Sequence, residues 1–216
     1  MLYTDHYAYC FEHLYTRPWA AKHQVNLSTL ERLLHCRSGV WLDTFCGQGW
    51  HFANTGSHMQ KVGIDRSSAQ LAIAQKNNPN CFFIKADLGK SLLKNSCADL
   101  ITNFWGSYCY LADVESVINF FSSACTAVKS DGALYWELLQ IEDLQTFNSS
   151  RFAEEAGARV QEISGFHWTY TDAGGRHEMI SPSLDFFLEV ASIYFAKVNH
   201  WHDQHFMTHL VCEHRY

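Results

Sequence analysis

Short apolar segments alternate with longer amphipathic segments along most of the chain. The apolar segments are rich in Val, Ile, Phe, Leu and Trp and contain few polar residues, which predicts strands buried on both faces. We expect strands over residues 39–45, 61–65, 81–87, 98–105 and 132–140.

The segments between these strands carry typical helix-start signals. Ser67 or Ser68 is the expected N-cap of a helix over residues 67–78, and Ser28 with Glu31 has capping-box spacing before an earlier helix. Helices that alternate with strands predict right-handed crossovers and a parallel sheet covered on both sides.

A further helix is expected over residues 112–129, and residues 129–132 should end it and turn into the fifth strand. Helical spacing places its apolar residues on one stripe. The stripe consists of Val114, Val117, Ile118, Phe121 and Cys125.

The pattern changes after residue 140. Residues 159–172 and 177–181 read as two strands around a glycine turn, a hairpin insertion, and Pro182 suits the first turn of a helix over 183–195. Two last strands are expected, over residues 196–203 and 206–215. The predicted fold is an α/β, Rossmann-like three-layer sandwich whose seven-stranded, mostly parallel sheet has an antiparallel last strand.

A glycine-containing loop follows the first strand. In an open parallel sheet, ligands bind outside the carboxyl ends of the strands, where Asp43, Gly47 and Gly49 are expected. Phe52 stands where a dinucleotide motif needs its third glycine, and a P-loop lysine is absent. Asp43 would repel a pyrophosphate, whereas it suits a ligand with an ammonium and a sulfonium group.

Two more carboxylates end the next strands. Asp65 is placed to accept hydrogen bonds from both hydroxyls of a ribose, and Asp87 to meet an adenine amino group. Taken singly, Asp65 also suits capping of the following helix.

With these residues, the chain resembles class I S-adenosylmethionine-dependent methyltransferases of the bacterial small-molecule type over about residues 35–140. "LDTFCGQGWH" is similar to the family motif D-x-x-C-G-x-G, and "VGID" to its ribose-binding strand end. Phe45 stands where the family often has glycine, although related small-molecule enzymes carry Phe there. The resemblance assigns S-adenosylmethionine to Asp43, Phe45, Gly47, Gly49, Asp65, Arg66, Asp87, Leu88 and Asn103, the last through its backbone.

The same resemblance divides one domain, residues 1–216, into four segments. They are a helical lid over 1–34, a cofactor-binding core over 35–140, a substrate-covering insertion over 141–181, and a closing helix and strands over 182–216.

Methyl transfer from a sulfonium mainly needs a positioned acceptor in a dry pocket that tolerates a cation. Aromatic faces attract a cation by roughly 0.5–2 kcal/mol each. Trp105, Tyr108 and Tyr110 follow the fourth strand, and Trp136 and Glu137 end the fifth. The candidate catalytic residues are Trp105, Tyr108, Tyr110, Glu137 and His167.

Other aromatic segments are candidates for the walls of the acceptor site. Residues 103–106 lack the two prolines of the [DNS]-P-P-[YF] motif, which disfavours a nucleobase amine as acceptor. The N-terminal candidates are Tyr7, Tyr15 and Trp19, and those of the hairpin are His167, Trp168, Tyr170 and His177. The candidate general bases, which the sequence does not rank, are His51, His167, His177 and Glu137.

The histidine-rich end of the chain does not predict a metal site. His200 and His202 would share one face of a strand, while His205 and His209 would lie on the opposite side. We therefore expect no metal.

Composition and charge argue against several classes of binding partner. A formal charge of −6 without a basic run argues against nucleic acid, and no apolar run is long enough to span a membrane. The chain begins without a signal-peptide pattern, and its eight cysteines are scattered without a C-x-x-C pair. We expect a cytoplasmic monomer or homodimer that acts on a small molecule.

Three functions remain open. The first is transfer of a methyl group to O, N or C of a small metabolite. The second is cyclisation of the cofactor itself with release of methylthioadenosine, as resemblance to azetidine-2-carboxylate synthases would suggest. The third is a non-catalytic interaction module with the cofactor fold.

Overall fold

A computed structural model describes residues 8, 10–11, 16, 19–35 and 37–216. Its main sheet has seven strands, in the order β3 (Phe82–Lys85), β2 (Gln60–Asp65), β1 (Val40–Thr44), β4 (Ala98–Asn103), β5 (Val128–Leu138), β10 (Thr208–Arg215) and β9 (Phe195–His202). Strands β1 to β5 are parallel, and β10 pairs antiparallel with both β5 and β9. The expected antiparallel last strand is confirmed, and it lies inside the sheet rather than at its edge.

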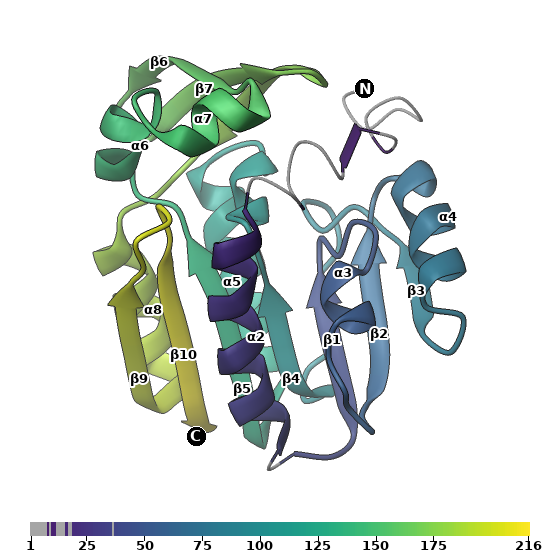
Figure 1. Cartoon of the computed structure of the whole chain (residues 1–216). Helices are drawn as coiled ribbons and strands as arrows, with labels where there is room; N and C mark the ends of the chain where they lie inside the picture. The colour runs from purple at the N-terminus through teal and green to yellow at the C-terminus, as the bar shows by residue number, and fades with distance from the viewer. Residues whose placement is uncertain (1–7, 9, 12–15, 17–18, 36) are drawn as a thin grey trace.

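Helices cover both faces of this sheet (Figure 1). One face carries α2 (Ala20–His35), α3 (Trp50–Ala53) and α4 (Ser68–Asn77), and the other carries α5 (Val114–Ala127) and α8 (Leu184–Tyr194). The predicted three-layer α/β sandwich is therefore confirmed. Among the described helices, none has the length and apolar character needed to cross a bilayer.

The two faces of the sheet bury separate clusters, because successive side chains of a strand point to opposite sides. The cluster under α2 contains Leu30, Leu33, Trp41, Leu100 and Tyr135. The cluster under α5 and α8 contains Leu42, Ile101, Phe121, Trp136 and Phe187. Adjacent residues of one strand thus enter different cores, which fixes the register of the strands.

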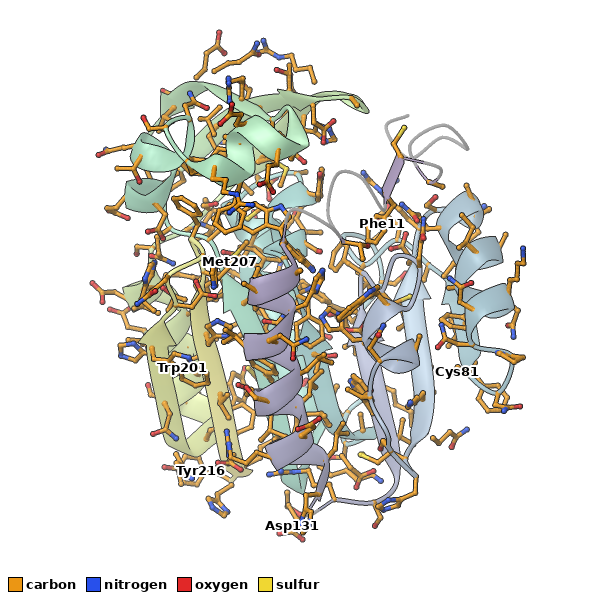
Figure 2. All side chains as sticks on the ribbon, viewed as in Figure 1. Phe11, Cys81, Asp131, Trp201, Met207 and Tyr216 are labelled. Carbon is orange, nitrogen blue, oxygen red and sulfur yellow. The ribbon has the colours of Figure 1, made fainter. Side chains whose placement is uncertain are left out.

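An insertion lies over the carboxyl ends of the strands (Figure 1). It consists of α6 (Ile141–Phe147), α7 (Arg151–Ala156) and an antiparallel sheet of β6 (Arg159–Ser164), β7 (His167–Asp172) and β8 (Gly175–Ile180). Figure 2 shows Phe11 and Met207 at this end of the molecule and Asp131 and Tyr216 at the opposite end.

The insertion has three strands where the sequence predicts two. Gly165, at φ 61°, makes a turn inside residues 159–172 and divides the expected long strand into β6 and β7. This left-handed conformation suits glycine.

Helix boundaries are partly as predicted. Ser67 caps α4, because its hydroxyl accepts a hydrogen bond from the Gln70 N–H at 3.3 Å. Ser28 does not cap a helix: α2 begins at Ala20, and the Ser28 hydroxyl donates to the Val25 carbonyl inside it.

Two strands also depart from the prediction. Phe82 and Ile84 of β3 are 58% and 48% exposed, because residues 86–97 form no helix that would cover this edge strand. The expected turn at 129–132 belongs to β5, whose pairing with β4 shifts register between Ala98 and Leu100.

Candidate functional site

The carboxyl end of β1 holds a buried carboxylate. Asp43 is 2% exposed, and its Oδ1 accepts a hydrogen bond from the Thr102 hydroxyl at 2.6 Å. The same hydroxyl accepts from the Trp41 indole N–H at 2.9 Å. The side chain of Asp43 is therefore held by a hydroxyl from the neighbouring strand β4, which Trp41 of β1 orients in turn.

No cationic side chain pairs with Asp43 in the described part of the chain. Burial raises its pKa to about 7; the negative charges of Asp65 and Glu137 act in the same direction, and the Thr102 hydrogen bond opposes them. A cationic ligand would stabilise a buried carboxylate of this kind, since a nearby positive charge favours its ionised form.

The loop after β1 has an unusual backbone. Phe45, Gly47 and Gly49 all have positive φ, at 54°, 53° and 66°. A Cβ on Gly47 would meet no atom within 4 Å, whereas one on Gly49 would lie 2.9 Å from the Asn78 amide. Gly47 therefore leaves its backbone open to the cavity, and Gly49 packs against α4.

Asp65, at the end of β2, holds this loop. Its Oδ2 accepts from the Gly47 N–H at 3.0 Å, and its Oδ1 from the Ser67 N–H at 2.8 Å. Burial raises its pKa, although these backbone hydrogen bonds oppose the rise. Asp65 therefore orders the start of α4, and it also lines the cavity.

Two adjoining cavities open at the strand ends. Phe45, Asp65, Arg66 and Tyr110 line both, and Asp43 and Gly47 line the first. The second contains Asp87 and Leu88. The fold thus brings together nine predicted site residues: Asp43, Phe45, Gly47, Asp65, Arg66, Asp87, Leu88, Trp105 and Tyr110.

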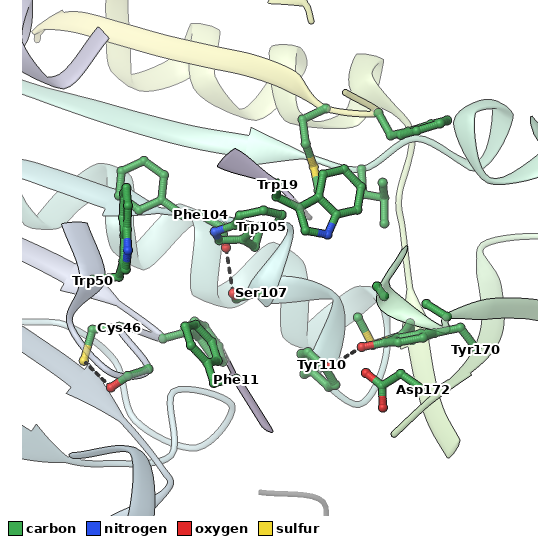
Figure 3. Close-up of a pocket in the computed structure, with 18 of the residues that line it drawn as sticks. Phe11, Trp19, Cys46, Trp50, Phe104, Trp105, Ser107, Tyr110, Tyr170 and Asp172 are labelled. Atoms are coloured by element: carbon green, nitrogen blue, oxygen red, sulfur yellow. Dashed lines mark hydrogen bonds between the residues drawn. The ribbon is translucent and has the colours of Figure 1, made fainter. Parts of the chain in front are cut away.

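The first cavity continues beneath the insertion and is walled mainly by aromatic rings (Figure 3). Trp105 meets Trp19 edge-to-face with ring centroids 5.3 Å apart, and Trp19 stacks on Phe152 at 4.3 Å. Other rings on its wall belong to Phe11, Trp50, Phe104, Phe147, Trp168, Tyr170 and Phe206. Tyr7 and Tyr15 lie outside the described residues.

A buried ion pair contacts both the ring and the backbone N–H of Trp105. The Lys22 ammonium contacts both oxygens of Glu137, at 2.5 and 2.7 Å, and lies 3.8 Å from the centre of the Trp105 ring. Glu137 Oε2 accepts from the Trp105 N–H at 2.8 Å, where Trp105 has φ 63°. Burial lowers the pKa of Lys22, and Glu137 opposes this shift.

Glu137, Asp203 and His209 have ligand atoms close enough to hold a metal ion. His209 Nε2 contacts Asp203 Oδ2 at 2.9 Å, and Nδ1 contacts the Tyr135 hydroxyl at 2.8 Å. Lys22 already supplies a positive charge at Glu137, so the cluster has its own cation. The strand-face pattern missed this cluster because its members come from β5, β10 and the loop before β10.

Several predicted residues lie away from the cavities. Tyr108 is fully buried against Trp136, and its hydroxyl accepts from the Leu139 N–H, so it is a core residue and lines neither cavity. Trp136 is likewise a core residue. His167 is exposed at the start of β7 and also lines neither cavity, so the structure does not place it with the other candidate catalytic residues.

Glu137 and Asn103 line neither cavity. Glu137 instead accepts from the N–H of Trp105, which does line the first cavity. The Asn103 amide donates to the Thr44 hydroxyl at 3.1 Å, so this side chain connects β4 to β1. His51 stacks on Phe104 at 3.7 Å, and burial lowers its pKa.

Sequence reasoning missed several contributors. Lys22 lies in the segment expected to form the N-terminal lid, where nothing marks it as the partner of Glu137. Asp172 lines the cavity beside Tyr110 and Tyr170, and only its place next to the glycine turn could have suggested it.

No family model matches the sequence, and no curated protein matches it. Solved structures do match in fold. The PH0226 protein from Pyrococcus horikoshii superposes with a TM-score of 0.74 at 15% identity, over 96% of this chain and 98% of that chain.

Two further structures are named methyltransferases. CalS10, an amino pentose methyltransferase from Micromonospora echinaspora solved with S-adenosylmethionine bound, has a TM-score of 0.65 at 13% identity, with 91% of each chain covered. The sugar N-methyltransferase KedS8 from a Streptoalloteichus species has a TM-score of 0.64 at 17% identity, over 93% of this chain and 90% of that chain. The chain has the fold of class I S-adenosylmethionine-dependent methyltransferases.

Proposed function

We propose that the protein binds S-adenosylmethionine and transfers its methyl group to a small molecule. The observation that carries this proposal is Asp43, a buried carboxylate without a cationic partner among the described residues, beside a glycine loop and a second buried carboxylate. The structural likeness to enzymes of this class supports it.

The residues present fit the cofactor by their chemistry. Asp43 would hold the ammonium group, and the open backbone at Gly47 would lie against the methionine part. Asp65 would hold the ribose hydroxyls, and Asp87 with Leu88 would bind adenine in the adjoining cavity. When bound, the cofactor supplies a methyl group activated by its sulfonium.

The rest of the chain would orient the acceptor and exclude water. Trp19 and Trp105 close the cavity from the side of α2, and the insertion closes it from above. Among the described residues that line the first cavity, Arg66 is the sole arginine and no lysine is present. We infer that the acceptor carries little negative charge.

Binding can be tested by thermal unfolding with S-adenosylmethionine. At a hundred times the dissociation constant, the ligand should add about 2.7 kcal/mol of stability. Asp65→Ala should lose most of this shift, because the ribose loses its acceptor. Asp131→Asn is the matched control, since Asp131 lies at the opposite end of the molecule (Figure 2) and should keep the full shift. A normal shift in Asp65→Ala would refute the ribose assignment.

The reaction can be tested by mass spectrometry. Adenosylhomocysteine that forms only with added metabolites supports methyl transfer. Methylthioadenosine from the cofactor alone would support cyclisation instead, and neither product under either condition would favour a binding module.

A further inference from the structure

Four polar side chains form a continuous hydrogen-bonded chain at the insertion end of the cavity. The Tyr110 hydroxyl lies 2.7 Å from the Tyr170 hydroxyl and 3.1 Å from Nδ1 of His177. Nε2 of His177 lies 2.9 Å from Oδ1 of Asp172. Figure 3 shows the Asp172 carboxylate beside the pair of tyrosines, which both line the cavity.

The chemistry of these groups fixes the direction of the chain. Asp172 can only accept when ionised, so Nε2 of His177 carries the hydrogen and Nδ1 accepts from the Tyr110 hydroxyl. His177 is fully buried and stacks on Tyr170, with centroids 4.2 Å apart and ring planes within 6°. The imidazole is therefore held in one orientation between Tyr110 and Asp172.

Charge at this end of the cavity is negative. Asp172 is the charged residue of the described lining here, whereas Asp43, Asp65 and Arg66 lie at the strand ends. Its Oδ1 accepts from His177 and from the Gly174 N–H at 2.7 Å, and no described residue donates to its Oδ2. The remaining walls are apolar or aromatic: Trp19, Leu139, Leu144, Phe147, Trp168 and Met179.

A carboxylate among aromatic faces attracts an organic cation. An ammonium ion has no free electron pair and must lose a proton before it can accept a methyl group. The hydrogen-bonded chain offers that proton a route away from the cavity, from Tyr110 to His177.

We propose that this end of the cavity binds an amine as its ammonium ion, and that Tyr110, His177 and Asp172 take its proton. This inference rests on the proposed methyl transfer. The ammonium proton passes to the Tyr110 oxygen while the Tyr110 hydroxyl proton passes to Nδ1 of His177. One proton and one positive charge leave the amine, which regains its electron pair, and the imidazolium is paired with Asp172.

Three described residues face His177 with polar groups. They are Tyr110 from the 3-10 turn η2 (Ser107–Tyr110), and Tyr170 and Asp172 from β7. Arg176, the neighbour of His177 on β8, instead pairs with Glu162 at 3.1 Å.

Calorimetric binding of amine and alcohol pairs tests the ammonium site. The probes are phenethylamine, tryptamine and hexylamine, each compared with the alcohol that has the same carbon skeleton. We expect at least one amine to bind at least tenfold more tightly than its alcohol, and Asp172→Asn to abolish this preference. Alcohols that bind as well as amines, no binding of any amine, or an undiminished preference in Asp172→Asn would each overturn the proposal.

The thermal stabilisation of the same proteins by S-adenosylmethionine distinguishes the ammonium site from the proposed function. An intact shift with no amine preference overturns the ammonium site alone. Amine preference without a shift contradicts the proposed function instead.

The proton route is tested by kinetics with the tightest-binding amine. Tyr110→Phe should lower kcat about 100-fold and leave KM within a few-fold, as expected for loss of a positioned proton acceptor. Tyr170→Phe is the matched variant, because it removes the other hydroxyl of the pair and keeps the Tyr110–His177 contact. Its kcat should therefore fall much less. Equal losses, or no turnover of an amine that binds, would overturn the proton route.

Discussion

Two buried carboxylates stand at the same end of the sheet and differ in their partners. Asp43 lies near the end of β1, and among the described residues only the Thr102 hydroxyl donates a hydrogen bond to its side chain, whereas Glu137 on β5 has the Lys22 ammonium, the Asn26 amide and the Trp105 N–H. Their exposures are 2% and 0%. Burial alone therefore does not distinguish them; the neighbouring charge does.

This difference indicates two roles. A buried charge that already has its countercharge supports structure, and here it fixes the backbone of Trp105. A buried carboxylate without a countercharge is costly to the free protein and gains from a cationic ligand. We therefore assign Glu137 to the architecture of the cavity and Asp43 to binding.

The largest effect is expected for Lys22→Met. This change leaves the Glu137 charge buried without its cation, so the free energy of unfolding should fall by about 3–5 kcal/mol. Denaturant unfolding at neutral pH measures the loss.

The matched control is the double variant Lys22→Met with Glu137→Gln. It removes both charges, and the Gln side-chain oxygen can still accept from Trp105, so most of the stability should return. If the double variant is no more stable than Lys22→Met, the assigned role of this ion pair is wrong.

Asp43→Asn should act in the opposite direction on stability. The raised pKa of Asp43 means that its contribution to folding is present below about pH 4 and is lost as pH rises to about 7. At pH 8 the free energy of unfolding of the variant should therefore exceed that of the natural protein by at most about 4 kcal/mol. The same change should weaken S-adenosylmethionine binding about 30-fold, the effect of about 2 kcal/mol from a lost charged contact.

The pH dependence of binding sharpens the same point. If the ligand needs ionised Asp43 with a pKa of about 7, the affinity of the natural protein should rise about tenfold between pH 6 and pH 8. Asp43→Asn should show a flat profile in calorimetry. A profile that rises equally in the variant would assign the pH dependence to another group.

The smallest effect is expected for Glu213. This carboxylate lies nearer the surface and has two cationic partners. Burial would raise its pKa, but hydrogen bonds from Lys197 and Arg37, at 2.8 Å each, lower it to about 2. Its contribution is therefore present above about pH 4.5 and is lost as pH falls toward 2. Glu213→Gln should cost about 1 kcal/mol at pH 7, because Lys197 is half exposed, and much less at pH 3. Equal losses at both pH values would contradict this assignment.

The residues at the strand ends could be predicted because the order of strands and helices along the chain implies a parallel sheet. Asp43 lies on β1 and is followed by the loop with Gly47 and Gly49, and the order of the strands places Asp65 and Asp87 beside it. The insertion could not be predicted as well. Gly165 marks the turn that divides β6 from β7, but glycine alone does not say whether a strand ends or bulges there.

The aromatic candidates show the same limit. Tyr108 and Tyr110 are two residues apart, yet one is buried in the core and the other lines the cavity. The short 3-10 turn at Ser107–Tyr110 directs these two side chains to different sides. The alternation of apolar and polar residues along the sequence does not reveal this turn.

Local periodicity, and the parallel sheet that it implies, were enough to predict the α/β sandwich and the carboxylates at the strand ends. The partners of these and other polar side chains became known from the folded structure. Lys22 meets Glu137, and Tyr110 meets His177, through contacts between residues far apart in the chain. Such pairings depend on distances of a few ångströms in the folded protein, which the spacing of residues along a sequence does not contain.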